Sequence, residues 1–257
     1  MKIKFYKYQG TGNDFVMIDN RDLHFPNGIS LIERICDRRF GIGADGLILI
    51  QNHNSLDFQM IYFNADGSQS LCGNGSRCAV NFARQLGIIE NETRFKTIAG
   101  TYEAFVDESE IVHLKMTDIE PPVSKGQDYF LNNGSPHHIT FTQKNDLIDV
   151  YSEGKKVRES DAYAPQGTNV NFVEILDEST IHVRTYERGV ENETLSCGTG
   201  VTASSLAAAL NGVKSPVSVQ TKGGNLSVKF DRSENDKFVD IWLSGPAKRV
   251  YDGEIEL

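Results

Sequence analysis

The chain of 257 residues is long enough for two modest domains, and its 39% of hydrophobic and 24% of charged residues are typical of a globular protein with a sizeable core. Its formal net charge of −9 argues against a nucleic-acid partner, because phosphate binding requires clustered Lys and Arg side chains. No apolar run approaches the roughly 18 residues that cross a bilayer, so we expect no membrane partner either.

The first residues, 1–15, lack the apolar region of a secretory signal peptide, so we expect a cytoplasmic protein. Its cysteines should be reduced there, and structural disulfides are not expected. Cys72 and Cys78 are separated by five residues and no pair of His residues accompanies them, so we expect no metal site. Cys36 and Cys78 are interpreted as buried apolar side chains.

The first half of the chain contains a series of recognisable segments. "TGNDFVMID" (11–19) is followed by "YFNADGSQSL" (62–71) and then by Cys72, which directly precedes Gly-Asn-Gly. A predicted helix follows and ends at Gly87, as helices often do at a glycine. "TIAG" then begins at Thr97, and alternating apolar and polar residues predict strands over 101–116.

The second half repeats this series in the same order. "GTNVNFVEI" (167–175) resembles the first segment and pairs Asn13 with Asn169. "YERGVENETLS" precedes "CGTG", in which Cys197 again comes directly before Gly-X-Gly. A predicted helix ends at Gly212, "TKGG" begins at Thr221, and strands are predicted over 225–243.

A series repeated in this way predicts two homologous, pseudo-symmetric α+β domains. The boundary is placed at 118–128, where two prolines interrupt regular structure. We therefore expect an N-terminal domain over 1–118 and a C-terminal domain over 119–248, with the last strand, 249–257, returning to the first domain.

The two cysteine motifs indicate acid–base chemistry. Glycines at a helix start let backbone N–H groups approach an anion, and the helix dipole adds positive potential there. The same field favours the thiolate of Cys72 and of Cys197. If related domains place both thiols in one interdomain cleft, one thiolate and one thiol can remove and deliver a proton at one carbon. That chemistry suits cofactor-independent racemisation or epimerisation of an amino acid, and neither a pyridoxal-phosphate nor a dinucleotide signal is evident.

These segments resemble those of the diaminopimelate epimerase family. "GTGNDFVMID", "RRFGIGADGL", "FNADGSQSLCGNGSRC", "GTNVNFV", "YERGVENETLSCGTG" and "VYDGEIEL" stand in the family's order over nearly the whole chain. The resemblance implies an isomerase without pyridoxal phosphate, in which each domain is a β-sheet wrapped around a central helix. It implies interconversion of LL- and meso-diaminopimelate in lysine and peptidoglycan-precursor synthesis. It also implies a small-molecule amino-acid substrate and a homodimer.

The resemblance further implies residue roles. Cys72 and Cys197 would be the two acid–base groups, with pKa values tuned by His137 and Glu187. Substrate-binding residues are expected to contact the reacting or the distal amino-acid group, namely Asn13, Asn64, Gly73, Asn74, Ser135, Asn169, Glu187, Arg188, Gly198 and Thr199. Asp45 and Asp66 are interpreted as turn residues.

Three positions depart from the family pattern. Ser135 stands where the family usually has Asn, and residues 190–192 look one residue longer than the common spacing. Gly46 stands where some members carry glutamine.

Other functions also remain open. The nearest is a racemase or epimerase of another amino acid, such as proline or hydroxyproline. A cysteine hydrolase or redox protein, or a catalytically silent amino-acid-binding module, are the alternatives from other classes.

Overall fold

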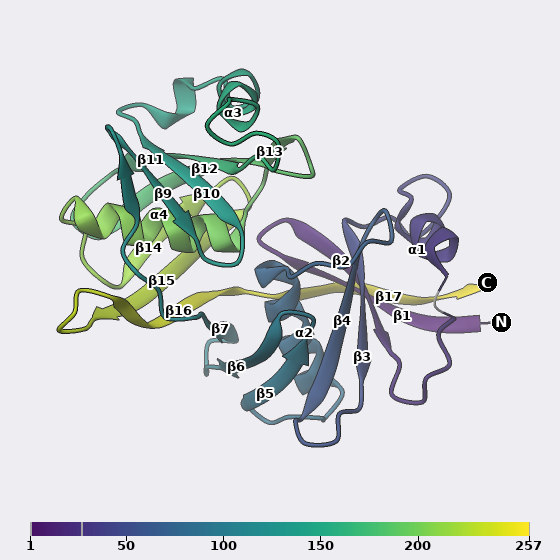
Figure 1. The fold of residues 1–257 in the computed structure, drawn as a ribbon. Helices are drawn as coiled ribbons and strands as arrows, with labels where there is room; N and C mark the ends of the chain where they lie inside the picture. Colours follow the sequence, from purple (N-terminus) through teal and green to yellow (C-terminus); the bar gives the residue numbers. More distant parts are fainter. Residues whose placement is uncertain (1, 27, 257) are drawn as a thin grey trace. The chain divides into compact units, whose positions relative to one another are not determined.

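The structure, a computed structural model, describes residues 2–26 and 28–256. The chain forms two compact units, Met1–Leu114 with Gly245–Leu257, and Lys115–Ser244 (Figure 1). Each unit combines a sheet with a long helix and a shorter one. No helix in the described part of the chain has the length and apolar character required to span a membrane.

In the described part of the first unit, hydrogen-bonded strands follow one another across the sheet in the order β17-β1-β2-β3-β4-β5-β6-β7. Its elements are β1 (Lys2–Gly10), β2 (Asn13–Asp19), α1 (Ile29–Cys36), β3 (Gly46–Gln51), β4 (Phe58–Asn64), α2 (Gly73–Gln85), β5 (Glu92–Thr97), β6 (Gly100–Val106), β7 (Ile111–Lys115) and β17 (Lys248–Glu256). Helix α2 packs against β1, β2, β3, β4, β6 and β17, so the sheet surrounds it. On the other face of the first strands, α1 closes an apolar cluster that includes Val16, Ile32 and Leu47.

The second unit is built in the same way around α4, whose side chains are small and almost all buried. Its elements are β8 (Val123–Lys125), β9 (Asp128–Asn132), β10 (Pro136–Phe141), η1 (Asn145–Leu147), α3 (Val150–Arg158), β11 (Asn169–Ile175), β12 (Thr180–Glu187), β13 (Asn192–Thr194), α4 (Gly198–Leu210), β14 (Val217–Thr221), β15 (Gly224–Arg232) and β16 (Phe238–Pro246). Strands β9, β10, β11, β12, β14 and β15 pack against α4. Helix α3 covers β11 and β12 through Val150, Phe172 and Tyr186.

The two units share one order of strand pairings. In the first, β1–β2 is antiparallel, β2–β3 parallel, β3–β4 antiparallel, β4–β5 parallel, and β5–β6 and β6–β7 antiparallel. In the second, β9–β10, β10–β11, β11–β12, β12–β14, β14–β15 and β15–β16 repeat that alternation. The predicted α+β class and the internal duplication are confirmed.

Small details of the repeat also agree. Gly87 and Gly212, with φ of 70° and 90°, follow the ends of α2 and α4, as the left-handed region favours glycine there. Thr97 Oγ1 donates to the carbonyl of Gly100 at 3.2 Å, and Thr221 Oγ1 donates to that of Gly224 at 2.7 Å. Each threonine therefore closes the same hairpin in its own unit.

One sequence match does not correspond to the duplication. Asn13 begins β2, and by pairing direction the counterpart of β2 is β10. Asn169 begins β11, whose counterpart is β3. The pairing of Asn13 with Asn169 inferred from their similar segments is therefore wrong, because the two asparagines stand on non-equivalent strands.

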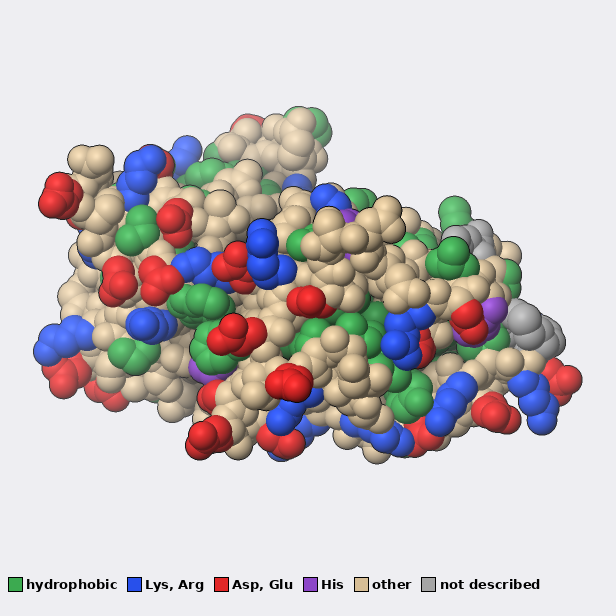
Figure 2. Space-filling model, turned by 90° about the horizontal axis from the view of Figure 1, so that it is seen from below, with side chains coloured by type: hydrophobic (Ala, Val, Ile, Leu, Met, Phe, Trp, Pro, Cys, Tyr) green, Lys and Arg blue, Asp and Glu red, His purple; other side chains and the backbone are tan. Residues whose placement is uncertain are grey.

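The charged surface has both signs. Figure 2 shows Lys and Arg side chains interspersed with Asp and Glu over the face in view. Exposed ion pairs of the described residues include Lys214 with Glu178 at 2.6 Å and Arg94 with Glu103 at 3.3 Å. Exposed pairs of this kind contribute little to stability.

Candidate active site

Cys72 is the N-cap residue of α2 and is half-buried. Its Sγ accepts a hydrogen bond from the backbone N–H of Gly75 at 3.4 Å. The sequence predicted glycines before the helix, but Gly73 and Gly75 form its first turn. The thiol thus lies directly at the positive end of the helix dipole, where a thiolate is favoured.

Asn13 holds the other side of the Cys72 thiol. Its Oδ1 accepts from Cys72 Sγ at 3.4 Å and from Asn74 Nδ2 at 3.3 Å, and its Nδ2 donates to Asp45 Oδ2 at 2.6 Å. The amide of Asn13 is therefore oriented by three partners. Asp45 was interpreted only as a turn residue, and its carboxylate in fact fixes this orientation.

Asp45 belongs to a cluster of ion pairs at the start of β2. Arg38 bonds both Asp14 and Asp45 at 2.7 Å, and the ammonium of the buried Lys7 lies 2.8 Å from Asp14. Burial acts to raise the pKa of Asp14, but hydrogen bonds from Arg38 and Lys7 outweigh it and lower the pKa to about 2. Asp14 therefore stays ionised, and the group holds the start of β2 in place.

Asn64 ends β4, in the turn that leads to Cys72. Its Nδ2 donates to Ser68 Oγ at 2.9 Å, and its Oδ1 accepts from Ser70 Oγ at 3.2 Å. Ser68 in turn donates to Asp66, so Asp66 is a turn residue, in keeping with its interpretation from the sequence.

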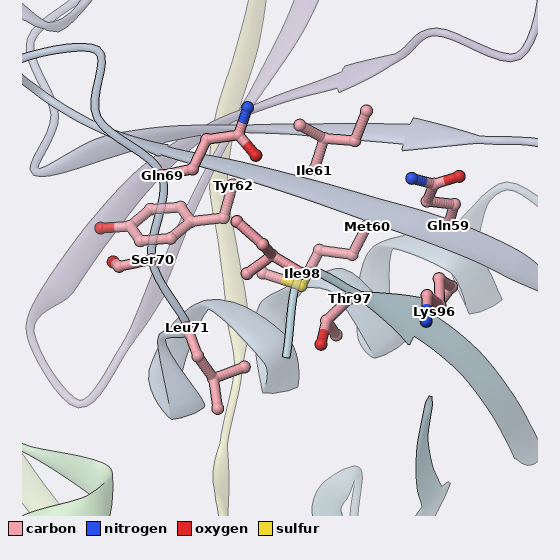
Figure 3. A pocket seen from close by; sticks show the side chains of 10 residues that line it. All are labelled: Gln59, Met60, Ile61, Tyr62, Gln69, Ser70, Leu71, Lys96, Thr97 and Ile98. Carbon is pink, nitrogen blue, oxygen red and sulfur yellow. The ribbon is translucent and has the colours of Figure 1, made fainter. Parts of the chain in front are cut away.

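A pocket of about 230 Å³ lies beside this turn, lined among others by Met60, Tyr62, Ser70, Leu71 and Ile98 (Figure 3). Tyr62 explains the glycine at position 46. A Cβ on Gly46 would lie 2.5 Å from Tyr62 Cε2 and 2.5 Å from the carbonyl of Phe63, so no larger side chain fits there.

Cys197 occupies the equivalent position in the second unit, as the N-cap residue of α4, and is buried. Its Sγ lies 3.6 Å from Thr199 Oγ1, in the first turn of the helix. Asn133 anchors that turn by donating to the carbonyl of Thr199 at 2.9 Å. Both predicted acid–base cysteines thus begin the central helix of their own unit.

His137 extends the contacts of Thr199 into the protein core. Its Nε2 lies 3.0 Å from Thr199 Oγ1, and its Nδ1 accepts from Asn171 Nδ2 at 3.1 Å. Burial, with the positive charge of Arg188, lowers the pKa of His137 to about 3 against the opposing effect of Asn171. The imidazole is therefore neutral near neutral pH, and it acts by hydrogen bonding rather than by charge.

Gly200 makes room for this arrangement. A Cβ at that position would lie 2.4 Å from Asn171 Oδ1 and 3.3 Å from His137 Cε1. Asn171 in turn accepts from Thr185 Oγ1 at 2.9 Å. The second glycine of the Cys-Gly-X-Gly motif is thus needed for the close approach of α4 to β10 and β11.

Asn169, the first residue of β11, contacts Arg188, the residue that follows β12. Asn169 Oδ1 accepts from the backbone N–H of Arg188 at 2.8 Å, and its Nδ2 donates to the carbonyl of Pro136 at 3.0 Å. The exposed guanidinium of Arg188 donates to the carbonyl of Gln166 at 3.3 Å. Ser135 is half-buried in the loop before β10.

The neighbouring Glu187 accepts from Thr194 Oγ1 at 2.9 Å. The structure therefore brings together Asn13, Cys72 and Asn74 in the first unit, and His137, Cys197 and Thr199 in the second. Gly73 and Gly198 are the first residues of α2 and α4 and lie directly after the cysteines.

Several residues of these networks were not anticipated from the sequence, among them Asn171 and the buried Arg77, whose Nη2 donates to Asn74 Oδ1 at 3.0 Å. Asn171 stands two residues after Asn169 in β11, so alternation along the strand places both side chains on one face of it. Arg77 is the only charged residue between Gly73 and Asn81 of α2, in a segment of otherwise small, apolar or amide side chains. A single arginine in such a segment is the available sign of a buried charge.

Comparison with known proteins places this chain among relatives of one kind. A model of the family described as diaminopimelate epimerase matches residues 5–120 and 129–250. The chain is 49% identical over 257 residues to the diaminopimelate epimerase of Flavobacterium psychrophilum, covering 98% of this chain and 100% of the relative. It is 41% identical to that of Aquifex aeolicus, covering 98% of each.

Solved structures share the fold at low identity. A phenazine biosynthesis protein of the PhzF family from Bacillus anthracis has a TM-score of 0.77 at 15% identity, covering all of both chains. A hydroxyproline epimerase from Agrobacterium vitis has a TM-score of 0.67 at 15% identity, covering 100% of this chain and 93% of that one. At this identity the likenesses show a common fold alone.

Proposed function

Because the chain belongs to the diaminopimelate epimerase family, we propose that it interconverts LL-2,6-diaminopimelate and meso-2,6-diaminopimelate. The enzyme is thus an isomerase that inverts one α-carbon. The observation that carries the mechanism is the repeated position of Cys72 and Cys197, each the N-cap residue of the central helix of its unit. Reactive thiols require a reducing compartment, which supports a cytoplasmic location.

In the proposed mechanism one thiolate takes the α-proton, and the other thiol delivers a proton to the opposite face of the same carbon. The C–H bond breaks as an S–H bond forms, and the electron pair is delocalised into the substrate carboxylate. The second S–H bond then breaks as the new C–H bond forms. The two cysteines finish with their protonation states exchanged, so the reverse reaction can follow directly.

The thiols are the groups suited to this proton transfer. His137 is buried with a pKa of about 3, so it cannot serve as a cationic acid near neutral pH. Burial raises the pKa of Cys36 to about 12 and that of Cys78 beyond its usual range, so both remain neutral thiols. Cys72 and Cys197 have in addition a helix N-terminus that favours the thiolate.

The remaining residues are proposed to bind the substrate. Backbone N–H groups at Gly73, Asn74, Gly198 and Thr199 suit the α-carboxylate, because helix N-termini bind anions. The exposed guanidinium of Arg188 suits the distal carboxylate, which it can bind in a bidentate manner.

The other polar side chains are proposed to bind ammonium groups or the distal end of the substrate. These are Asn13, Asn64, Ser135, Asn169 and Glu187, and the carboxylate of Glu187 suits an ammonium group best. Thr199 links Cys197 to His137, which supports a role for His137 in setting the protonation of that thiol.

The test is incorporation of solvent deuterium at the α-carbon of diaminopimelate by Cys72→Ala and Cys197→Ala. We expect each variant to lose epimerisation, because each lacks one of the two acid–base groups. Cys36→Ala is the matched control, since it removes a buried thiol outside the proposed site and should retain activity. Near-normal epimerisation by either site variant would contradict the two-base proposal. Turnover of proline derivatives but not of diaminopimelate by the wild type would contradict the proposed substrate.

A further inference from the structure

Helix α2 contains a buried arginine to which the proposed reaction gives no role. Arg77 is 0% exposed and is the largest fully buried side chain of the described residues. Its Nη2 donates to Asn74 Oδ1 at 3.0 Å and to Thr11 Oγ1 at 3.2 Å. Its Nε and Nη1 are buried and have no hydrogen-bond partner in the part of the chain that the structure describes. Burying a charge with so few partners is costly, so packing alone does not account for it.

Two cysteines are the titratable neighbours that act on the Arg77 guanidinium. Burial lowers the pKa of the guanidinium, and Cys78 and Cys72 act in the opposite direction. Arginine nevertheless stays protonated at neutral pH. Burial also raises the pKa of Cys78 well above its usual range, so Cys78 remains neutral. Cys72 is therefore the neighbour that can supply a negative charge.

Other titratable side chains stand on the strands packed against α2. They include Tyr6, Lys7 and Tyr8 on β1, Asp14 on β2, Tyr62 on β4, Tyr102 on β6 and Arg249 on β17. Of the others, Asp19 pairs with Arg21, and the remaining ones are exposed, namely Lys2, Lys4, Glu103, Lys248, Tyr251, Asp252, Glu254 and Glu256. Lys7 and Asp14 neutralise each other at 2.8 Å. Burial raises the pKa of Tyr8 and of Tyr102, so these phenols carry no charge near neutral pH. Among the described residues, no Asp or Glu forms an ion pair with Arg77.

We propose that Arg77 is a positioning residue, whose charge stabilises the thiolate of Cys72 and whose Nη2 fixes the amide of Asn74. A hydrogen-bonded chain connects the two effects. Because Arg77 donates to Asn74 Oδ1, the Nδ2 of Asn74 turns to Asn13 Oδ1, the same atom that accepts from Cys72 Sγ. The inference rests on the proposed function only in assigning acid–base work to Cys72.

Two opposing influences then act on the Cys72 thiol. The carbonyl of Asn13 accepts from Sγ and favours the protonated form. The cation of Arg77 and the N-terminus of α2 favour the thiolate. A reversible two-base reaction needs both states of the same thiol. The positive charge of Arg77 offsets the effect of the Asn13 carbonyl, so that Cys72 can adopt the thiolate form.

The second unit has no equivalent charge on its central helix. Five residues after Cys72 stands Arg77, and five residues after Cys197 stands Thr202, which donates to the carbonyl of Gly198 at 3.0 Å. Helix α4 carries no Lys, Arg, Asp or Glu at all. Arg77 therefore makes the two thiols electrostatically unequal, and Cys197 provides an internal reference.

The experiment measures iodoacetamide alkylation of each cysteine against pH in the full chain, resolved by mass spectrometry of the peptides. With Arg77→Met we expect Cys72 to react about tenfold more slowly at pH 7, equivalent to a midpoint about one pH unit higher. The Cys197 profile should change by less than about twofold at the same pH, since the substitution alters no charge of the second unit.

Three further variants separate the contributions. Arg84→Met removes the same charge from the last turn of α2 and should leave the Cys72 profile unchanged. Arg77→Lys keeps the charge and should restore most of the Cys72 reactivity. Arg77→Gln keeps a hydrogen-bond donor for Asn74 but lacks the charge, so its Cys72 should be alkylated as slowly as that of Arg77→Met. This variant also replaces Arg77→Met in the test if Arg77→Met does not fold.

An unchanged Cys72 profile in a folded Arg77→Gln or Arg77→Met protein would overturn the proposal. So would an equal shift in Arg84→Met, which would make the effect one of net charge. Alkylation needs no substrate, so it is independent of the proposed function. A wild-type protein with these profiles that failed to epimerise diaminopimelate would contradict the proposed function and leave the role of Arg77 in Cys72 ionisation standing.

Discussion

Asn171 donates from Nδ2 to Nδ1 of His137 across 3.1 Å, and both side chains are fully buried. The orientation of the Asn171 amide is fixed, because its Oδ1 accepts from Thr185 Oγ1 while its Nδ2 also donates to the carbonyl of His138. His137 must therefore carry its proton on Nε2 and donate it to Thr199. The hydroxyl of Thr199 accepts from His137 and keeps its own proton, which it can donate to the thiolate form of Cys197.

Exchanging the amide of Asn171 for a carboxylate tests this relay. In Asn171→Asp the carboxylate accepts a proton from Nδ1, so the tautomer reverses and Nε2 accepts from Thr199. Cys197 then loses its donor, and we expect kcat to fall by about 10- to 100-fold, in the range of a displaced acid–base group. The checks are steady-state kinetics and the 15N chemical shifts of the His137 ring.

Asn145→Asp is the matched control, because Asn145 is equally buried and donates to the carbonyls of Phe172 and His182 in the same unit. It should lower stability without moving the His137 resonances. Retention of the Nε2 proton together with full activity in Asn171→Asp would refute the relay.

The two glycines of the repeated motif predict unequal effects of the same substitution. In Gly200→Ala the new Cβ would stand 2.4 Å from Asn171 Oδ1, so the amide that orients His137 must move. In Gly75→Ala the Cβ would meet Ile48 Cδ1 at 3.1 Å, the end of a flexible side chain, and would be in ordinary contact with Met60 Cε and Phe15 Cε1 at 3.4 Å. We expect Gly200→Ala to reduce kcat at least about tenfold more than Gly75→Ala does.

Turnover and urea unfolding, measured together, distinguish lost chemistry from lost folding in this pair. An alanine also raises helix propensity by up to about 1 kcal/mol, which offsets part of any strain in both variants. Equal kinetic effects of the two substitutions would show that the crowding at Asn171 does not matter.

The sequence predicted best what depends on local structure. Cysteine before Gly-X-Gly correctly placed both thiols at helix starts, because glycine backbones and an N-cap position are local properties. Gly87 and Gly212 likewise marked the helix ends, since a residue with positive φ after a helix favours glycine.

Contacts between distant residues were not predictable in this way. Asn171 and His137 are 34 residues apart and meet only because β10 and β11 pair in parallel. The similar segments around Asn13 and Asn169 led to a wrong equivalence for the same reason. The position of a strand in the repeat depends on its pairing across the sheet and not on a short sequence match. The burial of Arg77 follows from packing by six strands, and its position in the sequence signals only an isolated charge.

The final prediction concerns the pH dependence of stability. The pKa of His137 falls from 6.5 to about 3 through burial and the charge of Arg188, against the hydrogen bond from Asn171. Between these pH values His137 is protonated in the unfolded chain but stays neutral in the native state. The stabilisation is therefore fully present above pH 6.5 and is lost as the pH falls, by up to about 1.4 kcal/mol per pH unit.

A variant without the imidazole should lack this contribution to the slope. His137→Gln will be less stable than the wild type at pH 7.5, because the Nε2 and Nδ1 contacts are lost. On lowering the pH to 5 we expect the difference in free energy of unfolding between the variant and the wild type to shrink by about 2 kcal/mol. The reason is that only the wild type loses stability through protonation of His137 in the unfolded chain. Urea titrations of both proteins from pH 5 to 7.5 measure this difference, in which other groups such as Asp14, with a pKa of about 2, cancel. A deficit that stays constant across this range would mean that His137 is protonated as readily in the native state as in the unfolded chain.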